Sequence, residues 1–180
     1  MATHSMRYSS PVGDITMASD GDNLIGLWLE GQKYFGGTVA EKMPECESSP
    51  VLAAVREWLD AYFLGKQPSI AELPLAPRGG AFRKAVWDIL CEIPYGRHVT
   101  YGEIASEMAV RMGRQSMSSQ AVGGAVGHNP ISIIIPCHRV VGANGSLTGY
   151  AGGIHKKIKL LEHEGVDVSR FFVPHKGTAL

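Results

Sequence analysis

Short apolar runs separated by turn residues dominate the first thirty positions of the chain. Residues 15–19 and 24–29 form two such runs, and the Asp-Gly-Asp-Asn segment at residues 20–23 lies between them. Apolar runs of this length that are bounded by turn residues are typical of paired β-strands. Residues 6–30 are therefore predicted to form an antiparallel hairpin.

A helix is predicted to follow the hairpin. Ser49 and Pro50 are residue types that favour the cap and the first position of a helix, and apolar side chains then recur at helical spacing over residues 52–63. Gly65 is the expected stop signal. The aromatic residues of this half, among them Trp28, Trp58, Tyr62 and Phe63, are interpreted as core residues without a chemical role.

Proline and glycine concentrate in residues 66–80, which hold Pro68, Pro74, Pro77, Gly79 and Gly80. Such a run is typical of a domain boundary. The boundary is placed after residue 77, which gives an N-terminal domain at residues 1–77 and a C-terminal domain at residues 78–180. The predicted fold class is mixed α/β (α+β), with an antiparallel sheet plus a helix in the first domain and mainly helices in the second.

Three helices are predicted in the first part of the C-terminal domain. Apolar residues over 82–93 form one helical face, Thr100 and Glu103 match the capping box that opens a second helix, and the small-residue segment 119–128 forms a third. Two short helices joined by a polar turn suggest a helix-turn-helix of the winged-helix-like type. An ordinary pair of packed helices is the alternative.

The isoleucine-rich residues 131–135 are predicted to form a buried strand, because β-branched residues favour strands. Pro136 supplies no backbone N–H, so the strand should end there and leave Cys137 and His138 on a bend. This bend matters because neighbours on a regular strand point to opposite faces.

The glycine-rich residues 146–153 are predicted to form a loop that shapes a pocket, and the last helix should run from residue 154 to residue 164 and stop at Gly165. Three lysines on this helix are interpreted as its solvated face: Lys156, Lys157 and Lys159.

The net charge is zero, but the two halves of the chain differ in charge. Residues 1–77 carry 5 Lys+Arg and 10 Asp+Glu, a balance of −5, whereas residues 78–180 carry 12 and 7, a balance of +5. A basic half indicates an anionic partner, although a solvated surface would produce the same asymmetry. Charge alone leaves both interpretations open.

Several protein classes are excluded by what the sequence lacks. No stretch approaches the roughly 20 consecutive apolar residues of a membrane span, and residues 1–5 do not begin a signal peptide, so a cytoplasmic protein without a membrane partner is expected. Cys46, Cys91 and Cys137 are odd in number and widely spaced, which argues against a disulfide framework and against zinc. Cys91 is interpreted as a packed thiol, and no metal is predicted.

Cys137 and His138 are the candidate chemical groups. A free cysteine has a pKa of about 8.5 and is mostly protonated at neutral pH, so it needs a neighbouring base to become a good nucleophile. His138 could be that base. The pair alone does not decide the matter, since neighbours in sequence need not touch in space.

Five motifs change this picture by their order and spacing. With them, residues 80–174 resemble the O6-alkylguanine-DNA alkyltransferases, whereas the N-terminal half resembles the variable domain of that family only loosely. The motifs are AVGGA at residues 121–125, NP at 129–130, IPCHRV at 135–140, GYAGG at 149–153 and LLEHEG at 160–165.

The resemblance implies direct-reversal DNA repair in a single step. Cys137 would accept the alkyl group, typically methyl, from O6-alkylguanine in double-stranded DNA and would keep it, so each molecule would react once, which is the activity of a methylated-DNA–protein-cysteine S-methyltransferase. His138 would act as general base, Glu164 would orient and charge it, and Asn129 would brace the turn. No cofactor is expected.

The resemblance also implies that the target base is flipped out of the duplex. Tyr101 would press on its phosphate, and the helix that contains Ala121 and Gly123 would enter the minor groove. Gln120 stands where many relatives carry an arginine finger, and Arg111 or Arg114 would then supply charge to phosphates. The expected lining of the base pocket is Val126, Val140, Tyr150 and Ala151, and Arg139 is counted among the DNA-binding residues.

Two other functions remain as alternatives. A Cys-His-Glu hydrolase or acyltransferase acting on a small substrate would leave the basic half and the helix-turn-helix unexplained. A non-catalytic protein that binds alkyl lesions would lack the cysteine that this chain has at residue 137. A monomer is expected, and the range of alkyl groups, O4-alkylthymine included, is left open.

Overall fold

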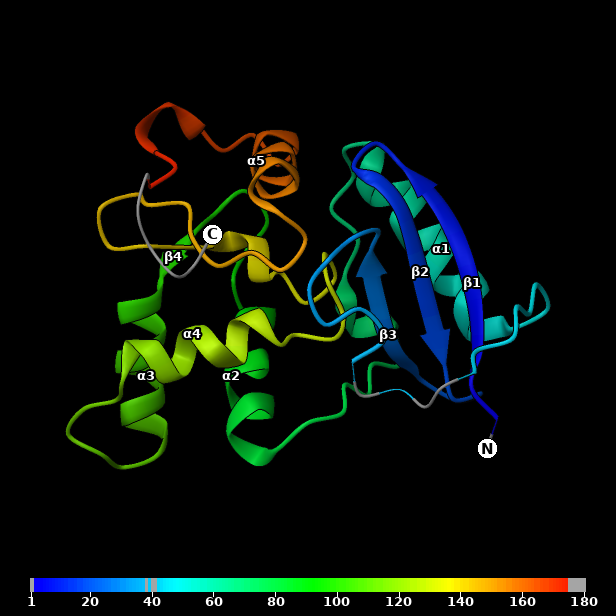
Figure 1. The fold of residues 1–180 in the computed structure, drawn as a ribbon, viewed down its shortest axis with the longest axis horizontal. Helices are drawn as coiled ribbons and strands as arrows, with labels where there is room; N and C mark the ends of the chain where they lie inside the picture. The colour runs from blue at the N-terminus through cyan, green and yellow to red at the C-terminus, as the bar shows by residue number, and fades with distance from the viewer. Residues whose placement is uncertain (1, 38, 40–41, 175–180) are drawn as a thin grey trace.

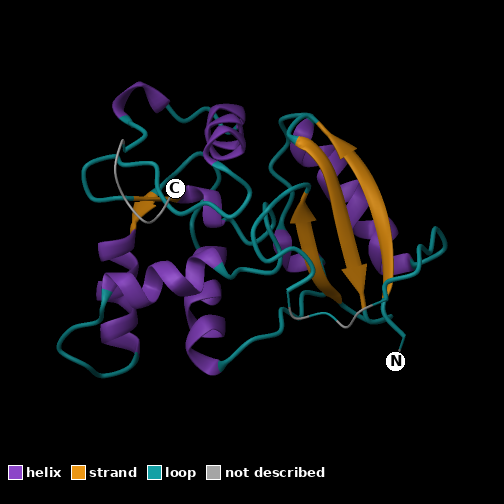
Figure 2. Cartoon of the chain, viewed as in Figure 1, coloured by secondary structure: helices purple, strands orange, loops and turns teal. Residues whose placement is uncertain are grey.

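The computed structural model describes residues 2–37, 39 and 42–174, so the outermost ends of the two predicted domains lie outside the described residues. A three-stranded sheet with one helix against it lies beside a group of shorter helices (Figure 1). Colouring by secondary structure makes the contrast plain, since the long strands all lie in the sheet (Figure 2). The predicted mixed α/β fold class is confirmed.

The N-terminal sheet is antiparallel, in the order β1 (His4–Ser10), β2 (Gly13–Ser19) and β3 (Leu24–Leu29). The predicted hairpin corresponds to β2 and β3. Strand β1 pairs with β2 along the edge that faces away from β3. Helix α1 (Pro50–Phe63) follows as predicted, with the Ser49 side chain accepting a hydrogen bond from the Leu52 N–H. Gly65 takes a positive φ of 84° directly after this helix, which suits a glycine stop.

Strand β3 is completely buried although it lies at the edge of the sheet. Its outer edge forms two single parallel bridges, from Leu24 to Leu75 and from Leu27 to Ile131. An unpaired strand edge exposes backbone donors and acceptors, so such coverage satisfies them. The second bridge joins the N-terminal sheet directly to the segment that precedes Cys137.

The C-terminal half is mainly helical. Both hydrogen bonds of the predicted capping box are present, because the Thr100 side chain accepts from the Glu103 N–H and the Glu103 side chain accepts from the Thr100 N–H. Two residues from each of two distant segments form a small parallel ladder between β4 and β5. The bounds of the elements are η1 Ile70–Glu72, α2 Ala81–Cys91, β4 Val99–Thr100, α3 Tyr101–Arg111, α4 Ser119–Gly127, η2 Cys137–Arg139, β5 Val140–Val141, α5 Ile154–His163 and η3 Val168–Arg170.

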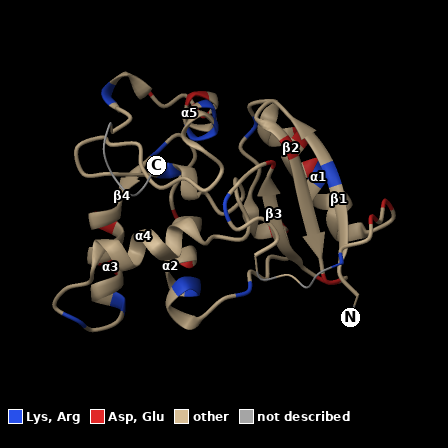
Figure 3. Ribbon diagram, viewed as in Figure 1, with Lys and Arg blue, Asp and Glu red and all other residues tan. Residues whose placement is uncertain are grey.

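Helices α3 and α4 form the predicted helix pair, joined by residues 112–118. Basic residues lie at the start of α2 and along this connection (Figure 3). Arg111 is bound by two carboxylates, at 2.8 Å from Glu107 and 2.6 Å from Glu92. The expectation that Arg111 serves DNA phosphates is therefore not supported, whereas Arg114 has no ion pair within the described part of the chain.

The predicted strand at residues 131–135 is wrong, because these residues form a compact turn after the single bridge at Ile131. The Ile134 N–H bonds to the Ser132 carbonyl at 2.8 Å, and Ile133 has a φ of 69°. A β-branched residue in the left-handed region is strained and persists only where the surroundings fix it. β-Branching had favoured a strand here, but the contacts around the turn override that preference.

Lys157 corrects a second expectation, since its side chain is buried rather than solvated. Its Nζ donates a hydrogen bond to the Thr148 carbonyl at 3.0 Å. The helical pattern alone did not reveal that the loop before α5 packs over this position. Lys159 is exposed as expected.

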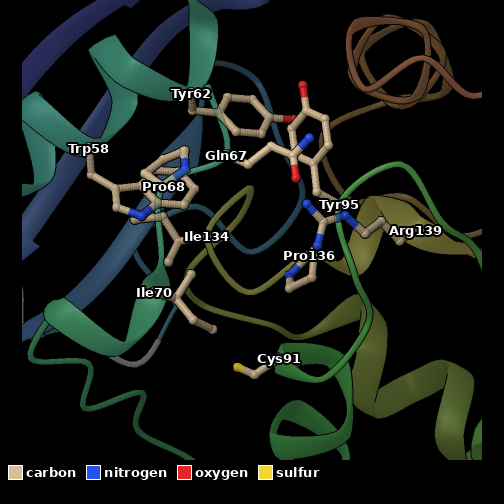
Figure 4. Close-up of a pocket in the computed structure, with 10 residues that line it drawn as sticks. All are labelled: Trp58, Tyr62, Gln67, Pro68, Ile70, Cys91, Tyr95, Ile134, Pro136 and Arg139. Atoms are coloured by element: carbon tan, nitrogen blue, oxygen red, sulfur yellow. The ribbon is translucent and has the colours of Figure 1, made fainter. Parts of the chain in front are cut away.

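A cavity of about 250 Å³ lies between the two halves (Figure 4). Trp58 and Tyr62 line it from α1, and Tyr95, Pro136 and Arg139 line it from the C-terminal half. Neither Cys137 nor His138 is among its lining residues. Within the described residues, no helix is long and apolar enough to cross a membrane.

Two glycine substitutions should change stability in opposite directions. A Cβ at Gly26 in β3 would overlap the buried ring of Trp28, so Gly26→Ala should lower the free energy of unfolding by about 1–3 kcal/mol. A Cβ at Gly124 in α4 would meet nothing, so Gly124→Ala should raise it by about 0.5–1 kcal/mol through helix propensity. Urea unfolding measures the free energy of unfolding of both variants. Changes of the same sign and size would contradict the close contact of Gly26 with Trp28 and the open space at Gly124.

Candidate active site

Cys137 opens the short helix η2, directly after the turn at residues 131–136. Its side chain is almost fully buried, at 6% exposure, and its N–H bonds to the Ile135 carbonyl at 2.8 Å. Burial raises the pKa of the Cys137 thiol, although a hydrogen bond with the Asn129 side chain and the charge of Lys157 act against that rise. The predicted bend at Pro136 is present, and the thiol is protonated at rest.

Asn129 braces the turn before Cys137 with both ends of its amide. Its Nδ2 donates to the carbonyls of Ile131, at 3.2 Å, and Ile135, at 2.8 Å, while its Oδ1 accepts from the Ile131 N–H at 3.0 Å. Three bonds from one buried side chain fix the backbone that carries the thiol. This placement accords with the expected brace.

His138 is fully buried beside Cys137 and is bound to Glu164. The distance from Nε2 to Glu164 Oε2 is 2.6 Å, whereas Nδ1 has no hydrogen-bond partner within the described residues. A carboxylate facing Nε2 places the proton on that nitrogen and leaves Nδ1 as an acceptor. Burial lowers the pKa of His138, and the charges of Arg139 and Lys157 lower it further, against the opposing effect of Glu164.

Glu164 follows the last residue of α5 and is buried in a ring of donors. Burial alone would raise the pKa of its carboxyl group, but hydrogen bonds and charge from the surrounding groups hold that pKa far below its usual range. Glu164 is therefore charged. The donors to it are Tyr62 Oη at 2.6 Å, His138 Nε2 at 2.6 Å, Arg139 Nε at 2.7 Å, Arg139 Nη2 at 3.1 Å and the Gly96 N–H at 3.2 Å.

Arg139 has a different place from the one expected among the DNA-binding residues. Its side chain is buried, with two nitrogens on Glu164 and with Nη1 donating to the Ile93 carbonyl at 2.7 Å. The guanidinium also lies over the Tyr95 ring, 5.8 Å from its centroid. With its donors occupied inside the protein, Arg139 supports Glu164 rather than contacting phosphate.

Tyr62 is a site residue that the sequence did not reveal. It is a core residue of α1, as predicted, but its hydroxyl donates to Glu164 across 102 positions of sequence. Helical spacing identifies the buried face of α1 and carries no information about which polar group the hydroxyl meets. Lys157 was missed for the same reason, and its charge acts on both Cys137 and His138.

Tyr101, at the start of α3, contacts the loop that precedes α5. Its hydroxyl donates to the Thr148 carbonyl at 2.9 Å, the same carbonyl that accepts from Lys157. Burial raises the pKa of Tyr101 to about 12. At Gly149, where φ is 70°, a Cβ would lie 3.0 Å from the Tyr101 hydroxyl, so glycine permits this close approach.

Most of the expected pocket residues are buried in the main core cluster, which also contains Cys137, and three of the expected DNA-contacting residues lie on α4. Val126, Val140 and Tyr150 belong to the same buried cluster as Cys137, and Ala151 is partly exposed. The Tyr150 hydroxyl has no hydrogen-bond partner within the described part of the chain. Gln120 and Ala121 are exposed in the first turn of α4, and Gly123 faces the Tyr101 ring.

The arrangement has the groups that could activate a cysteine nucleophile. A buried thiol is adjacent in sequence to a buried imidazole whose Nε2 is held by a charged carboxylate, and these are the residue types of a nucleophile–base–acid triad. No group of three or more His, Cys, Asp and Glu side chains that could hold a metal ion occurs in the described regions.

Family models match both halves of the chain. The model described as 6-O-methylguanine DNA methyltransferase, DNA binding domain, matches residues 81–166. The model described as 6-O-methylguanine DNA methyltransferase, ribonuclease-like domain, matches residues 5–77. Together these two matches cover most of the sequence.

Whole relatives are similar over nearly their full length. The methylated-DNA–protein-cysteine methyltransferase of Haemophilus influenzae is 41% identical over 159 residues, which cover 88% of this chain and 84% of that protein. The protein of the same name from Methanosarcina acetivorans is 42% identical, with 88% and 96% covered. A crystal structure of Mycobacterium tuberculosis OGT in complex with DNA superposes with a TM-score of 0.74 at 37% identity, covering 95% of each chain.

Removing the Tyr62 hydroxyl should destabilise the fold through Glu164. Tyr62→Phe leaves a buried carboxylate without one of its short hydrogen bonds, so the free energy of unfolding at pH 7 should fall by about 1.5–3 kcal/mol. Tyr95→Phe is the matched control, because its hydroxyl makes only a 3.4 Å bond to the His163 carbonyl. Urea unfolding of both variants gives the comparison.

The effect of Tyr62→Phe should also depend on pH. The folded-state pKa of Glu164 is depressed, so the stability from its charged form is present above the ordinary carboxyl pKa of 4.5 and is lost as pH falls below it. Both proteins share the unfolded state, so the difference between wild type and Tyr62→Phe should stay constant while Glu164 is charged in the fold, and should shrink only as pH falls to the depressed folded-state pKa. A difference that disappears between pH 7 and the ordinary carboxyl pKa would contradict a Glu164 carboxylate that its donors hold charged in the fold.

Proposed function

The chain belongs to the 6-O-methylguanine DNA methyltransferase family, and on this premise we propose that it repairs DNA by accepting the alkyl group of O6-alkylguanine on Cys137. The observation that carries the proposal is the hydrogen bond between His138 Nε2 and the charged Glu164, with the buried thiol of Cys137 next to His138 in the chain. The substrate is double-stranded DNA, with O6-methylguanine as the principal lesion.

The reaction is a displacement at the alkyl carbon. The Cys137 proton passes through one water to His138 Nδ1, as the sulfur forms its bond to carbon and the carbon–O6 bond breaks with its electron pair going to guanine. Glu164 stabilises the imidazolium that results, because it stays charged and faces Nε2. The thioether product is a poor leaving group, so the protein reacts once and needs no cofactor.

The resting site keeps both reactive groups neutral. Burial holds the pKa of Cys137 above and the pKa of His138 below their usual values. A preformed thiolate–imidazolium pair is therefore disfavoured before substrate arrives. Proton transfer accompanies the attack, and the uncharged thiol is less open to oxidation between encounters.

The target guanine must leave the helix to reach a thiol that is only 6% exposed. Helix α4 enters the minor groove with its small residues Ala121 and Gly123, and Gln120 in its first turn occupies the space that the base vacates. Tyr101 presses on the target phosphate. The flipped base lies between Tyr150, Val126, Val140 and the backbone near Ala151.

The two halves divide the work. Residues 78–180 form the DNA-binding and catalytic domain, and residues 1–77 form a scaffold domain that contributes Tyr62 to the Glu164 network. The protein acts as a monomer in the cytoplasm. A single chain carries all the groups that the proposed reaction uses.

Intact-protein mass spectrometry tests the transfer directly. Mixing the protein with duplex DNA that contains O6-methylguanine should add one methyl group per molecule, located on the peptide that contains Cys137, because the thioether is not released. Excess DNA should give no second addition. The mass should stay unchanged with unmodified duplex.

Cys137→Ser and His138→Gln serve as comparison variants. Cys137→Ser should bind the duplex without gaining mass, and His138→Gln should slow the transfer by about 10²–10⁴-fold, the usual contribution of a general base. Methylation that persists in Cys137→Ser would refute the assignment of the acceptor. Repeated turnover of a small ester would favour the hydrolase alternative instead.

A further inference from the structure

Gln32 is a buried amide just beyond β3, at 6% exposure, and it faces the active-site half of the molecule. Its Oε1 accepts from the Leu29 N–H at 2.7 Å and from the Ser132 hydroxyl at 3.2 Å, and its Nε2 lies 3.4 Å from the Lys33 carbonyl. Ser132 belongs to the turn that leads into Cys137. One side chain of the N-terminal domain therefore bonds directly to the segment that carries the thiol.

The residues around Gln32 make further bonds to that segment and to the loop beyond it. The Leu27 N–H donates to the Pro130 carbonyl at 2.8 Å, and the Ser132 N–H donates to the Leu27 carbonyl at 2.9 Å. On the other side, the Lys33 N–H donates to the Ala151 carbonyl at 2.9 Å. Residues 27–33 thus bind the chain both before and after Cys137.

These two attachment points define the space that the flipped base has to enter. The turn at residues 131–136 sets the position of the sulfur, and the loop around Ala151 forms the wall of the proposed base pocket. Because both are tied to the same seven residues, their separation depends on the conformation of that short segment. Gln32 fixes the conformation by closing Leu29, Lys33 and Ser132 around one amide.

We propose that Gln32 is a positioning residue for alkyl transfer, which sets the distance between the Cys137 turn and the base-binding loop from the N-terminal domain. The proposal rests on the proposed function of Cys137. Gln32 is buried and its hydrogen bonds are to Leu29, Lys33 and Ser132, so its loss should affect the reaction of bound DNA rather than DNA binding. Displacements of about 1 Å from the attacking geometry can slow a reaction by about 10²-fold.

Single-turnover kinetics at a series of DNA concentrations separate the rate constant of methyl transfer in bound DNA from the affinity for DNA. For Gln32→Leu, the limiting rate constant of methyl transfer to Cys137 from an O6-methylguanine duplex should fall by about tenfold or more. The DNA concentration at half saturation should stay unchanged. Gln67→Leu is the matched control, since Gln67 is an exposed residue of the same domain, and it should react like wild type.

Ser132→Ala provides the second arm and removes only one of the bonds to Gln32. It should lower the limiting rate constant less than Gln32→Leu does, and the double variant should be no slower than Gln32→Leu, because the two residues act through one contact. A limiting rate constant equal to that of wild type in Gln32→Leu would overturn the proposal, as would independent, multiplying effects of the two substitutions.

Two further outcomes are distinguishable. If Gln32→Leu does not fold, Ser132→Ala decides alone, and an unchanged limiting rate constant in that variant would overturn the proposal. If wild type itself gains no methyl group on Cys137, the proposed function fails before Gln32 is tested. A lower melting temperature with an unchanged rate constant would show that Gln32 is only structural.

Discussion

The buried charge of Glu164 is the constraint on which the rest of the site depends. A carboxylate inside a protein is costly unless donors surround it, and here those donors come from α1, from the segment after α2 and from η2. Satisfying one charge therefore brings together parts of the chain that are far apart in sequence. The same charge binds His138 at Nε2, while Nδ1 has no hydrogen-bond partner within the described residues.

The N-terminal domain takes part in this arrangement at two places. Tyr62 completes the ring of donors around Glu164, and the edge of β3 covers the turn that precedes Cys137. The left-handed conformation of Ile133 is held between that edge and the three bonds of Asn129. A turn held from both sides keeps a buried thiol in one position, which suits a protein that reacts only once.

Local signals predicted the elements, and long-range contacts decided the site. The capping box at Thr100 and the helix start at Ser49 were readable because each depends on neighbours within four residues. β-Branching predicted a strand at residues 131–135, but only Ile131 pairs, with Leu27, and the chain turns directly after it. The burial of Lys157 and the Tyr62–Glu164 bond depend on segments brought together by folding, which periodicity does not report.

The orientation of the His138 ring is the central claim, because it links the buried charge to the nucleophile. Nitrogen NMR of the protein labelled at histidine reports the protonation of each ring nitrogen at pH 7. We predict a neutral His138 with its proton on Nε2, toward Glu164, and with a bare Nδ1. A proton on Nδ1 of the neutral ring, or an imidazolium protonated on both nitrogens in the resting protein, would contradict the account.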